Sequence, residues 1–221
     1  VFFTGSAGVG KSFLLNYIVT SLKLKYGDKY SERVAVTAAT GIAATHISGT
    51  TVHAFGGFGI PKRYEDFNRV WKKDVKARWK STDVLIIDEV SMLSGEMFEE
   101  MERIGRELRG VNAAFGGIQV ILAGDFYQLP PIETRWNIGL EKDAFLNRGF
   151  VFQSPTWHQC QLVEQVLTKV FRQADGEFVR VLNDLREGRG QAAVEGLKRT
   201  CSRPLPAVNG IKPTELFPKN A

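Results

Sequence analysis

The first twelve residues constrain the fold of this chain more than any other stretch. An apolar run from Val1 to Thr4 leads into the loop GSAGVGKS at residues 5–12, and the spacing G-x-x-x-x-G-K-[ST] is that of a phosphate-binding P-loop. Glycines in such a loop permit backbone angles at which successive N–H groups point toward one anion. The helix that follows directs the positive end of its dipole at the same place.

The loop predicts a site for a nucleoside triphosphate. Its binding residues are expected to be Gly5, Ser6, Ala7, Gly8, Val9, Gly10, Lys11 and Ser12. Lys11 supplies a point charge for the β- and γ-phosphates, and the Ser12 hydroxyl is suited to binding Mg²⁺. A chance glycine turn is the alternative. It is disfavoured because Leu14, Ile18 and Leu22 follow at helical spacing and predict a buried helix face.

Two further apolar runs end in polar side chains. Val84 to Ile87 is followed by Asp88 and Glu89, and Val120 to Ala123 is followed within a few residues by Gln128. Continuous apolar runs predict buried parallel strands, and α/β folds keep their ligands at the carboxyl ends of such strands. We therefore expect Asp88 to hold Mg²⁺ and Glu89 to accept a proton from the attacking water. Gln128 suits a hydrogen bond to the γ-phosphate or to that water, and loop capping is its alternative role.

Small residues and hydroxyls follow the strand expected at Val34–Ala38. They lie in residues 40–44 and 49–55 and permit close approach of another backbone, although a tight turn explains them equally well. The segment from Lys62 to Lys80 carries eight positive and three negative charges, and this excess equals the net +5 of all 221 residues. Its aromatic residues are Tyr64, Phe67, Trp71 and Trp79.

That combination of charge and aromatic rings predicts nucleic-acid binding. Cations follow a phosphate backbone, and aromatic faces stack on unpaired bases. A solvated helix with aromatic core anchors is the alternative, which we favour for each tryptophan taken singly. No apolar run reaches the roughly 20 residues that span a bilayer, so no membrane partner is expected. The sequence begins inside a predicted strand, and we expect it to be cut from a longer protein.

Together these motifs resemble those of the petite-integration-frequency (PIF-type) DNA helicases of superfamily one, which are kin of the RecD-like helicases. GSAGVGKS resembles their Walker A motif, and TAATGIAA with GTTVHAFGGFG resembles motifs Ia and Ib. LIIDEVSML resembles motif two, and GGIQVILAGDFYQLPP resembles motif three. Residues 101–116 resemble the insert that distinguishes this family from other helicases. The resemblance covers nearly the whole chain.

The resemblance implies an α/β P-loop NTPase fold of the RecA-like type, with a mostly parallel sheet, helices on both faces and a small inserted 1B element. It implies ATP hydrolysis with Mg²⁺, coupled to 5′-to-3′ translocation on single-stranded DNA and to unwinding at duplex junctions. It assigns Lys11, Ser12, Asp88, Glu89 and Gln128 to the nucleotide and adds Arg172, in the sequence VFRQ, as a contact to the γ-phosphate. It places Thr40, Thr51 and His53 on the DNA path.

The same resemblance implies a domain organisation. Residues 1–203 would form RecA-like domain 1A, with the 1B wedge at about 59–79, and residues 204–221 would lead into a second RecA-like domain that this chain lacks. Helices are expected over 177–187 and 190–199. The parent protein is expected to act as a monomer in replication, repair, recombination or telomere maintenance, in the nucleus or mitochondrion if it is eukaryotic. The segment alone is expected to bind nucleotide weakly and not to unwind DNA.

Two other function classes remain open from the sequence. One is a P-loop ATPase that remodels proteins and uses the basic segment as an ordinary surface. The other is a DNA-binding module whose ATP site has decayed. Hydrolysis independent of DNA would favour the first, and unchanged turnover in an Asp88→Ala or Glu89→Gln variant would favour the second.

Overall fold

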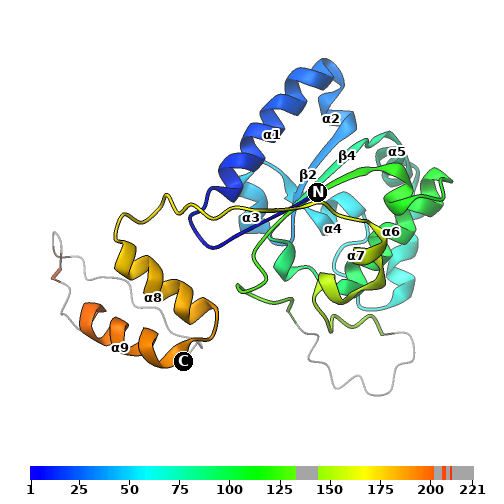
Figure 1. Cartoon of the computed structure of the whole chain (residues 1–221). Coiled ribbons are helices and arrows are strands. Elements are labelled where there is room, and N and C mark those ends of the chain that lie inside the picture. Colours follow the sequence, from blue (N-terminus) through cyan, green and yellow to red (C-terminus); the bar gives the residue numbers. More distant parts are fainter. Residues whose placement is uncertain (133–143, 202–205, 208–209, 211–221) are drawn as a thin grey trace. The chain divides into compact units, whose positions relative to one another are not determined.

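A parallel β-sheet of six strands organises the described part of the chain, in the order β3-β2-β4-β5-β1-β6. The computed structural model describes residues 1–132, 144–201, 206–207 and 210. The strands are β1 (Phe2–Thr4), β2 (Val34–Ala38), β3 (Thr50–Thr51), β4 (Val84–Asp88), β5 (Gln119–Ala123) and β6 (Glu164–Val166). All five strand pairings are parallel. The predicted α/β P-loop fold with a parallel sheet is therefore confirmed (Figure 1).

Helices and helical turns connect these strands. The α-helices are α1 (Lys11–Tyr26), α2 (Tyr30–Arg33), α3 (Gly41–His46), α4 (Val52–Gly56), α5 (Lys73–Ser81), α6 (Gly95–Arg109), α7 (Pro155–Gln159), α8 (Gly176–Arg186) and α9 (Gly190–Cys201). Short 3₁₀ turns are η1 (Gly27–Lys29), η2 (Tyr64–Trp71), η3 (Val90–Met92), η4 (Ala114–Gly117) and η5 (Val151–Gln153).

The central strand β4 buries both of its faces. Leu85 and Ile87 belong to a large apolar cluster that includes residues of α4, α5, α6 and η4. Val84 and Ile86 belong to a second cluster with Leu15 and other residues of α1. Alternate side chains of a strand point to opposite faces, so an uninterrupted apolar run is what a strand covered on both faces requires. Figure 1 shows α1 and α6 on opposite sides of the sheet.

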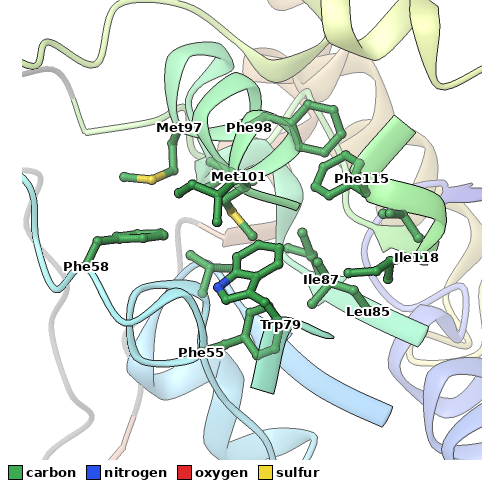
Figure 2. Close-up of a cluster of buried hydrophobic side chains, with 14 of the residues drawn as sticks. Phe55, Phe58, Trp79, Leu85, Ile87, Met97, Phe98, Met101, Phe115 and Ile118 are labelled. Carbon is green, nitrogen blue, oxygen red and sulfur yellow. The ribbon is translucent and has the colours of Figure 1, made fainter. Parts of the chain in front are cut away.

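The larger cluster is rich in aromatic rings (Figure 2). Trp79 is fully buried, with its ring centroid 4.8 Å from that of Phe55. Phe98 and Phe115 pack with centroids 5.0 Å apart. The predicted core face of α6, made of Met97, Met101, Ile104 and Leu108, is buried in this cluster. Trp79 is therefore the core anchor we favoured, whereas that interpretation is wrong for Trp71, whose surface is 50% exposed because it ends η2 facing away from the cluster.

Arg109, the last residue of α6, ties together the residues between α5 and β4. Its Nη1 donates to the carbonyl oxygens of Trp79, Lys80 and Thr82 at 3.1, 2.9 and 2.7 Å. Its Nε donates to the carbonyl oxygen of Gly116 at 2.7 Å. The stretch that resembles the family-specific insert thus serves as an anchor, because one guanidinium satisfies four backbone carbonyls.

The chain divides into two compact units, Val1–Arg172 and Gln173–Ala221. The sheet and everything packed on it belong to the first unit, and the second contains α8 and α9, which pack against each other. Both helices lie within two residues of the predicted spans. Most of residues 204–221, the predicted linker, lie outside the described part of the chain.

Candidate functional site

The loop at residues 5–12 joins β1 to α1 and has the backbone form of an anion cradle. Gly5 has φ of 145° and Gly8 has φ of 81°, values that side chains disfavour. The Nζ of Lys11 donates to the carbonyl oxygens of Gly5 and Ser6 at 2.8 and 3.1 Å. The ammonium group therefore lies against the loop itself, where a bound phosphate chain would need its charge.

Residues 167–172, which continue from β6, run against this loop. The backbone N–H of Leu167 donates to Thr4 and that of Phe171 to Gly8, both at 2.8 Å. A Cβ on Gly5 would collide with the carbonyl oxygen of Leu167, and a Cβ on Gly8 would lie 2.7 Å from the Cβ of Arg172. The absence of side chains at these two glycines is what lets the segment bring Arg172 to the loop.

The carboxylates predicted to bind metal and activate water lie at the end of β4. Asp88 is only 5% exposed, and its Oδ1 accepts a hydrogen bond from the backbone N–H of Glu89 at 2.9 Å. Burial raises the pKa of Asp88, and the Glu89 N–H and the Lys11 charge partly offset that rise. Burial, followed by the negative charge of Asp88, likewise raises the pKa of Glu89, against the influence of Lys11. A carboxyl with a raised pKa in a cleft is suited to accept a proton.

The loop after β5 presents Gln128 beside a buried carboxylate. Asp125 is 1% exposed, and its Oδ2 accepts a hydrogen bond from Nε2 of Gln128 at 3.1 Å. The backbone N–H of Tyr127 donates to its Oδ1 at 3.2 Å. These contacts fix the Gln128 amide with its nitrogen turned toward Asp125.

One cavity of about 470 Å³ joins these elements. Its lining residues are Ala7, Gly8, Gly10, Lys11, Ser12, Phe13, Glu89, Gln128, Phe171 and Arg172. The structure thus brings together five predicted nucleotide residues from four separate stretches of sequence. Asp88 is not among the lining residues and lies directly behind Glu89 in the chain.

Sequence reasoning missed Phe13 and Phe171 as lining residues. Their neighbours Ser12 and Arg172 were identified, but an apolar residue next to a motif is more often part of the core. The exposure of both rings, 80% for Phe13 and 68% for Phe171, is the property that distinguishes them. That property is not visible in the sequence.

The three residues predicted to contact DNA lie at the opposite half of the sheet, after β2 and around β3. Thr40 caps α3 by accepting from the Ala43 N–H at 3.2 Å, and Thr51 caps α4 by accepting from the Ala54 N–H at 3.1 Å. The His53 ring lies edge-on to Phe58 with centroids 6.1 Å apart. Burial lowers the pKa of His53, which favours the neutral imidazole. The hydroxyls have a structural task here, and DNA contact remains a prediction for all three.

The basic segment of residues 62–80 is partly structural and partly exposed. Arg78 donates through Nε to the carbonyl oxygen of Phe55 at 2.8 Å, which fixes α5 to α4. Lys72, Lys73 and Lys80 are exposed. Beside them the Nζ of Lys76 lies 5.5 Å from the ring centroid of Trp71. An exposed ring surrounded by cations is the surface that the nucleic-acid interpretation requires.

The donor atoms suit a magnesium ion that also binds phosphate. Within the described residues, no group of three or more His, Cys, Asp or Glu side chains is arranged to hold a metal. Mg²⁺ is commonly held by one or two protein oxygens together with substrate phosphates, and the Ser12 hydroxyl and Asp88 carboxylate are of that kind. In the part of the chain that the structure describes, no helix is both long and apolar enough to cross a membrane.

Comparison with known proteins agrees with this geometry. Residues 1–196 match the family described as PIF1-like helicase. The ATP-dependent DNA helicase PIF1 of Emericella nidulans is 42% identical over 224 aligned residues, which cover all of this chain and 29% of that protein. The Pif1 helicase from Candida albicans gives a TM-score of 0.82 at 40% identity, over 98% of this chain and 47% of that one.

A third match is Pif1 helicase from Bacteroides, crystallised with ADP-AlF3 and single-stranded DNA. Its TM-score is 0.76 at 29% identity, over 94% of this chain and 47% of that one. The chain therefore spans less than a third of its curated relative and about half of each structural relative. Because the family match extends over almost all of the sequence and the loop, acids and glutamine converge on one cavity, the chain belongs to the PIF1-like helicase family.

Proposed function

We propose that this chain is the nucleotide-binding part of an ATP-dependent DNA helicase that moves 5′ to 3′ on single-stranded DNA. The observation that carries the proposal is the single cavity shared by Lys11, Ser12, Glu89, Gln128 and Arg172. A phosphate loop, a carboxylate and an arginine on one cavity are the parts that phosphoryl transfer to water requires. The Bacteroides relative, crystallised with ADP-AlF3, supports a nucleotide as the ligand.

Each lining residue has a role in this chemistry. The loop amides and Lys11 hold the β- and γ-phosphates, and Arg172 stabilises the charge that develops on the γ-phosphate. Glu89, with its raised pKa, accepts a proton from the attacking water, which Gln128 orients. Ser12 and Asp88 would hold Mg²⁺, which supplies charge neutralisation for the phosphate oxygens. An arginine contact of this type contributes roughly 10³–10⁵ in rate.

The DNA path is the second part of the proposal. Thr40, Thr51 and His53 would contact the single strand, and the element at about 59–79 would meet the duplex junction as the 1B wedge. The Bacteroides relative was crystallised with single-stranded DNA. Residues 1–203 would form domain 1A, and residues 204–221 would lead to a second RecA-like domain that closes on ATP. We infer a monomeric motor, placed in the nucleus or mitochondrion as its eukaryotic relatives imply.

An ATPase assay on the full-length protein that contains this chain, with and without single-stranded DNA, tests the proposal. We expect DNA to stimulate hydrolysis, and Lys11→Ala to abolish both nucleotide binding and hydrolysis. Strand separation should require a 5′ single-stranded tail. Hydrolysis that is equally fast without DNA would contradict the helicase assignment.

A further inference from the structure

Two exposed aromatic rings line the candidate nucleotide cavity, and the phosphate chemistry above does not use them. Phe13 is 80% exposed and Phe171 is 68% exposed. Single exposed apolar residues are ordinary on protein surfaces. Two large rings on one cavity, contributed by segments about 160 residues apart in the sequence, are a more specific feature.

Both rings are attached to rigid parts of the phosphate loop. Phe13 lies in the first turn of α1, directly after Lys11 and Ser12. The backbone N–H of Phe171 donates to the carbonyl oxygen of Gly8 at 2.8 Å. The Cδ2 atom of the Phe171 ring lies 4.0 Å from the position that a Cβ on Gly10 would occupy. The Nζ of Lys169 lies 5.1 Å from the Phe171 ring centroid, so a cation covers part of this ring as well.

The chemistry of the cavity lining is divided. Lys11, Ser12, Glu89, Gln128 and Arg172 carry the charged and polar groups that match a metal–triphosphate and its attacking water. Ala7 and the two phenylalanines carry apolar surface. A nucleoside triphosphate is divided in the same way, into a charged phosphate chain and a planar, uncharged base. Aromatic side chains stack on bases whatever the base identity, because every base has a π-face.

We propose that Phe13 and Phe171 form the base-stacking subsite for the nucleotide that the phosphate loop binds. The inference rests on the proposed nucleotide site and adds the part of the ligand that the motif residues do not address. Stacking is worth about 1–3 kcal/mol per base, which corresponds to roughly 5- to 150-fold in affinity. The rings therefore favour a nucleoside triphosphate over a bare polyphosphate.

The test compares two probes on the full-length protein: ATP and inorganic tripolyphosphate, each with Mg²⁺, by calorimetry or competition binding. In the variant carrying both Phe13→Ala and Phe171→Ala, the Kd for ATP is expected to rise at least 5-fold while the Kd for tripolyphosphate stays unchanged. Phe171→Tyr should retain the affinity for ATP, since it keeps the ring. Tyr17→Ala is the matched control. Tyr17 is 67% exposed one turn further along α1 and does not line the cavity.

The outcomes separate this inference from the proposed function. If the parent protein binds both probes and the double variant binds ATP as well as the parent does, the stacking subsite is wrong and the phosphate site stands. Equal loss of both probes in the double variant would also overturn the inference, because the rings would then support the loop rather than the base. If the parent binds neither probe, both the inference and the proposed function fail.

Discussion

The amide nitrogen of Gln128 donates to the carboxylate of Asp125 across 3.1 Å, and that carboxylate is almost completely buried. A carboxylate accepts hydrogen bonds and cannot donate them, so this contact turns the carbonyl oxygen of Gln128 away from Asp125. Of the two roles open to Gln128, orienting the attacking water suits this arrangement, because the free carbonyl oxygen accepts a hydrogen bond from water.

Asp125→Asn should therefore lower kcat for ATP hydrolysis about 10- to 100-fold, an amount that corresponds to roughly 1.4–2.8 kcal/mol, and leave the Kd for ATP nearly unchanged. An asparagine can donate as well as accept, so it no longer fixes the orientation of the Gln128 amide. Steady-state kinetics beside calorimetric binding would measure the two effects. A variant that loses ATP affinity and keeps kcat would contradict this role.

Asp88→Asn should stabilise the nucleotide-free protein while weakening its use of magnesium. Burial raises the pKa of Asp88 above its ordinary value near 3.8. The native state therefore binds this proton more tightly than the unfolded state, and stability falls as pH rises through the raised pKa. The advantage of Asp88→Asn in the free energy of unfolding should be largest at neutral pH and vanish below the ordinary pKa. Denaturant titrations at several pH values would show this trend, and an advantage that grows in acid would exclude it.

Glu89→Gln should abolish hydrolysis and preserve nucleotide binding, because an amide cannot accept the proton from water. In the parent protein, kcat should fall in acid through a pKa above the 4.5 of an ordinary glutamic acid, since burial and Asp88 raise it. A pH–rate profile of the full-length enzyme, with ATP binding measured at the same pH values, checks the prediction. A profile that stays flat down to pH 4.5 would rule out Glu89 as the base.

Arg109→Ala should lower the free energy of unfolding by about 2–3 kcal/mol, because hydrogen bonds to a charged group are worth about 1.5–3 kcal/mol and four carbonyls lose their donor. Arg103→Ala on the same helix is the control. Arg103 forms ion pairs with Glu100 and Glu107 on the protein surface, where such pairs contribute up to about 1 kcal/mol. Equal losses for the two variants would remove the special role of Arg109.

Trp71→Ala should weaken binding of single-stranded DNA by the full-length protein about 5- to 150-fold, the amount expected for one lost stacking contact. The fold should remain intact because this ring is half exposed. Trp79→Ala provides the contrast: its buried ring is expected to cost about 3–5 kcal/mol of stability. Fluorescence anisotropy and thermal melting would separate the two. Normal DNA affinity in Trp71→Ala would leave the basic segment without a stacking role.

The sequence was sufficient to predict the elements whose chemistry and spacing coincide. The phosphate loop, the strand before Asp88 and Glu89, and the apolar face of α6 are such elements, and the structure contains each of them. The convergence of Arg172 on the loop was predicted only through family resemblance, because its approach depends on a strand pairing between β1 and β6. Local pattern carries no information about that contact.

Exposure was the other property that pattern did not supply. Trp71 and Trp79 occur in the same basic context, yet one lies at the surface and the other in the core. The difference arises from where η2 ends and which side of α5 meets the sheet. Phe13 and Phe171 were missed for the same reason, since a ring beside a motif can face either the core or a cavity.

The grip of Arg109 on residues 79, 80 and 82 has a mechanical consequence. These residues connect α5, which follows the exposed Trp71, to β4, which ends at Asp88. A pull exerted on the basic segment by a nucleic-acid strand would meet no slack at this joint. The strain would pass along β4 toward the carboxylates, so a single arginine keeps the outer grip and the chemical centre on the same lever.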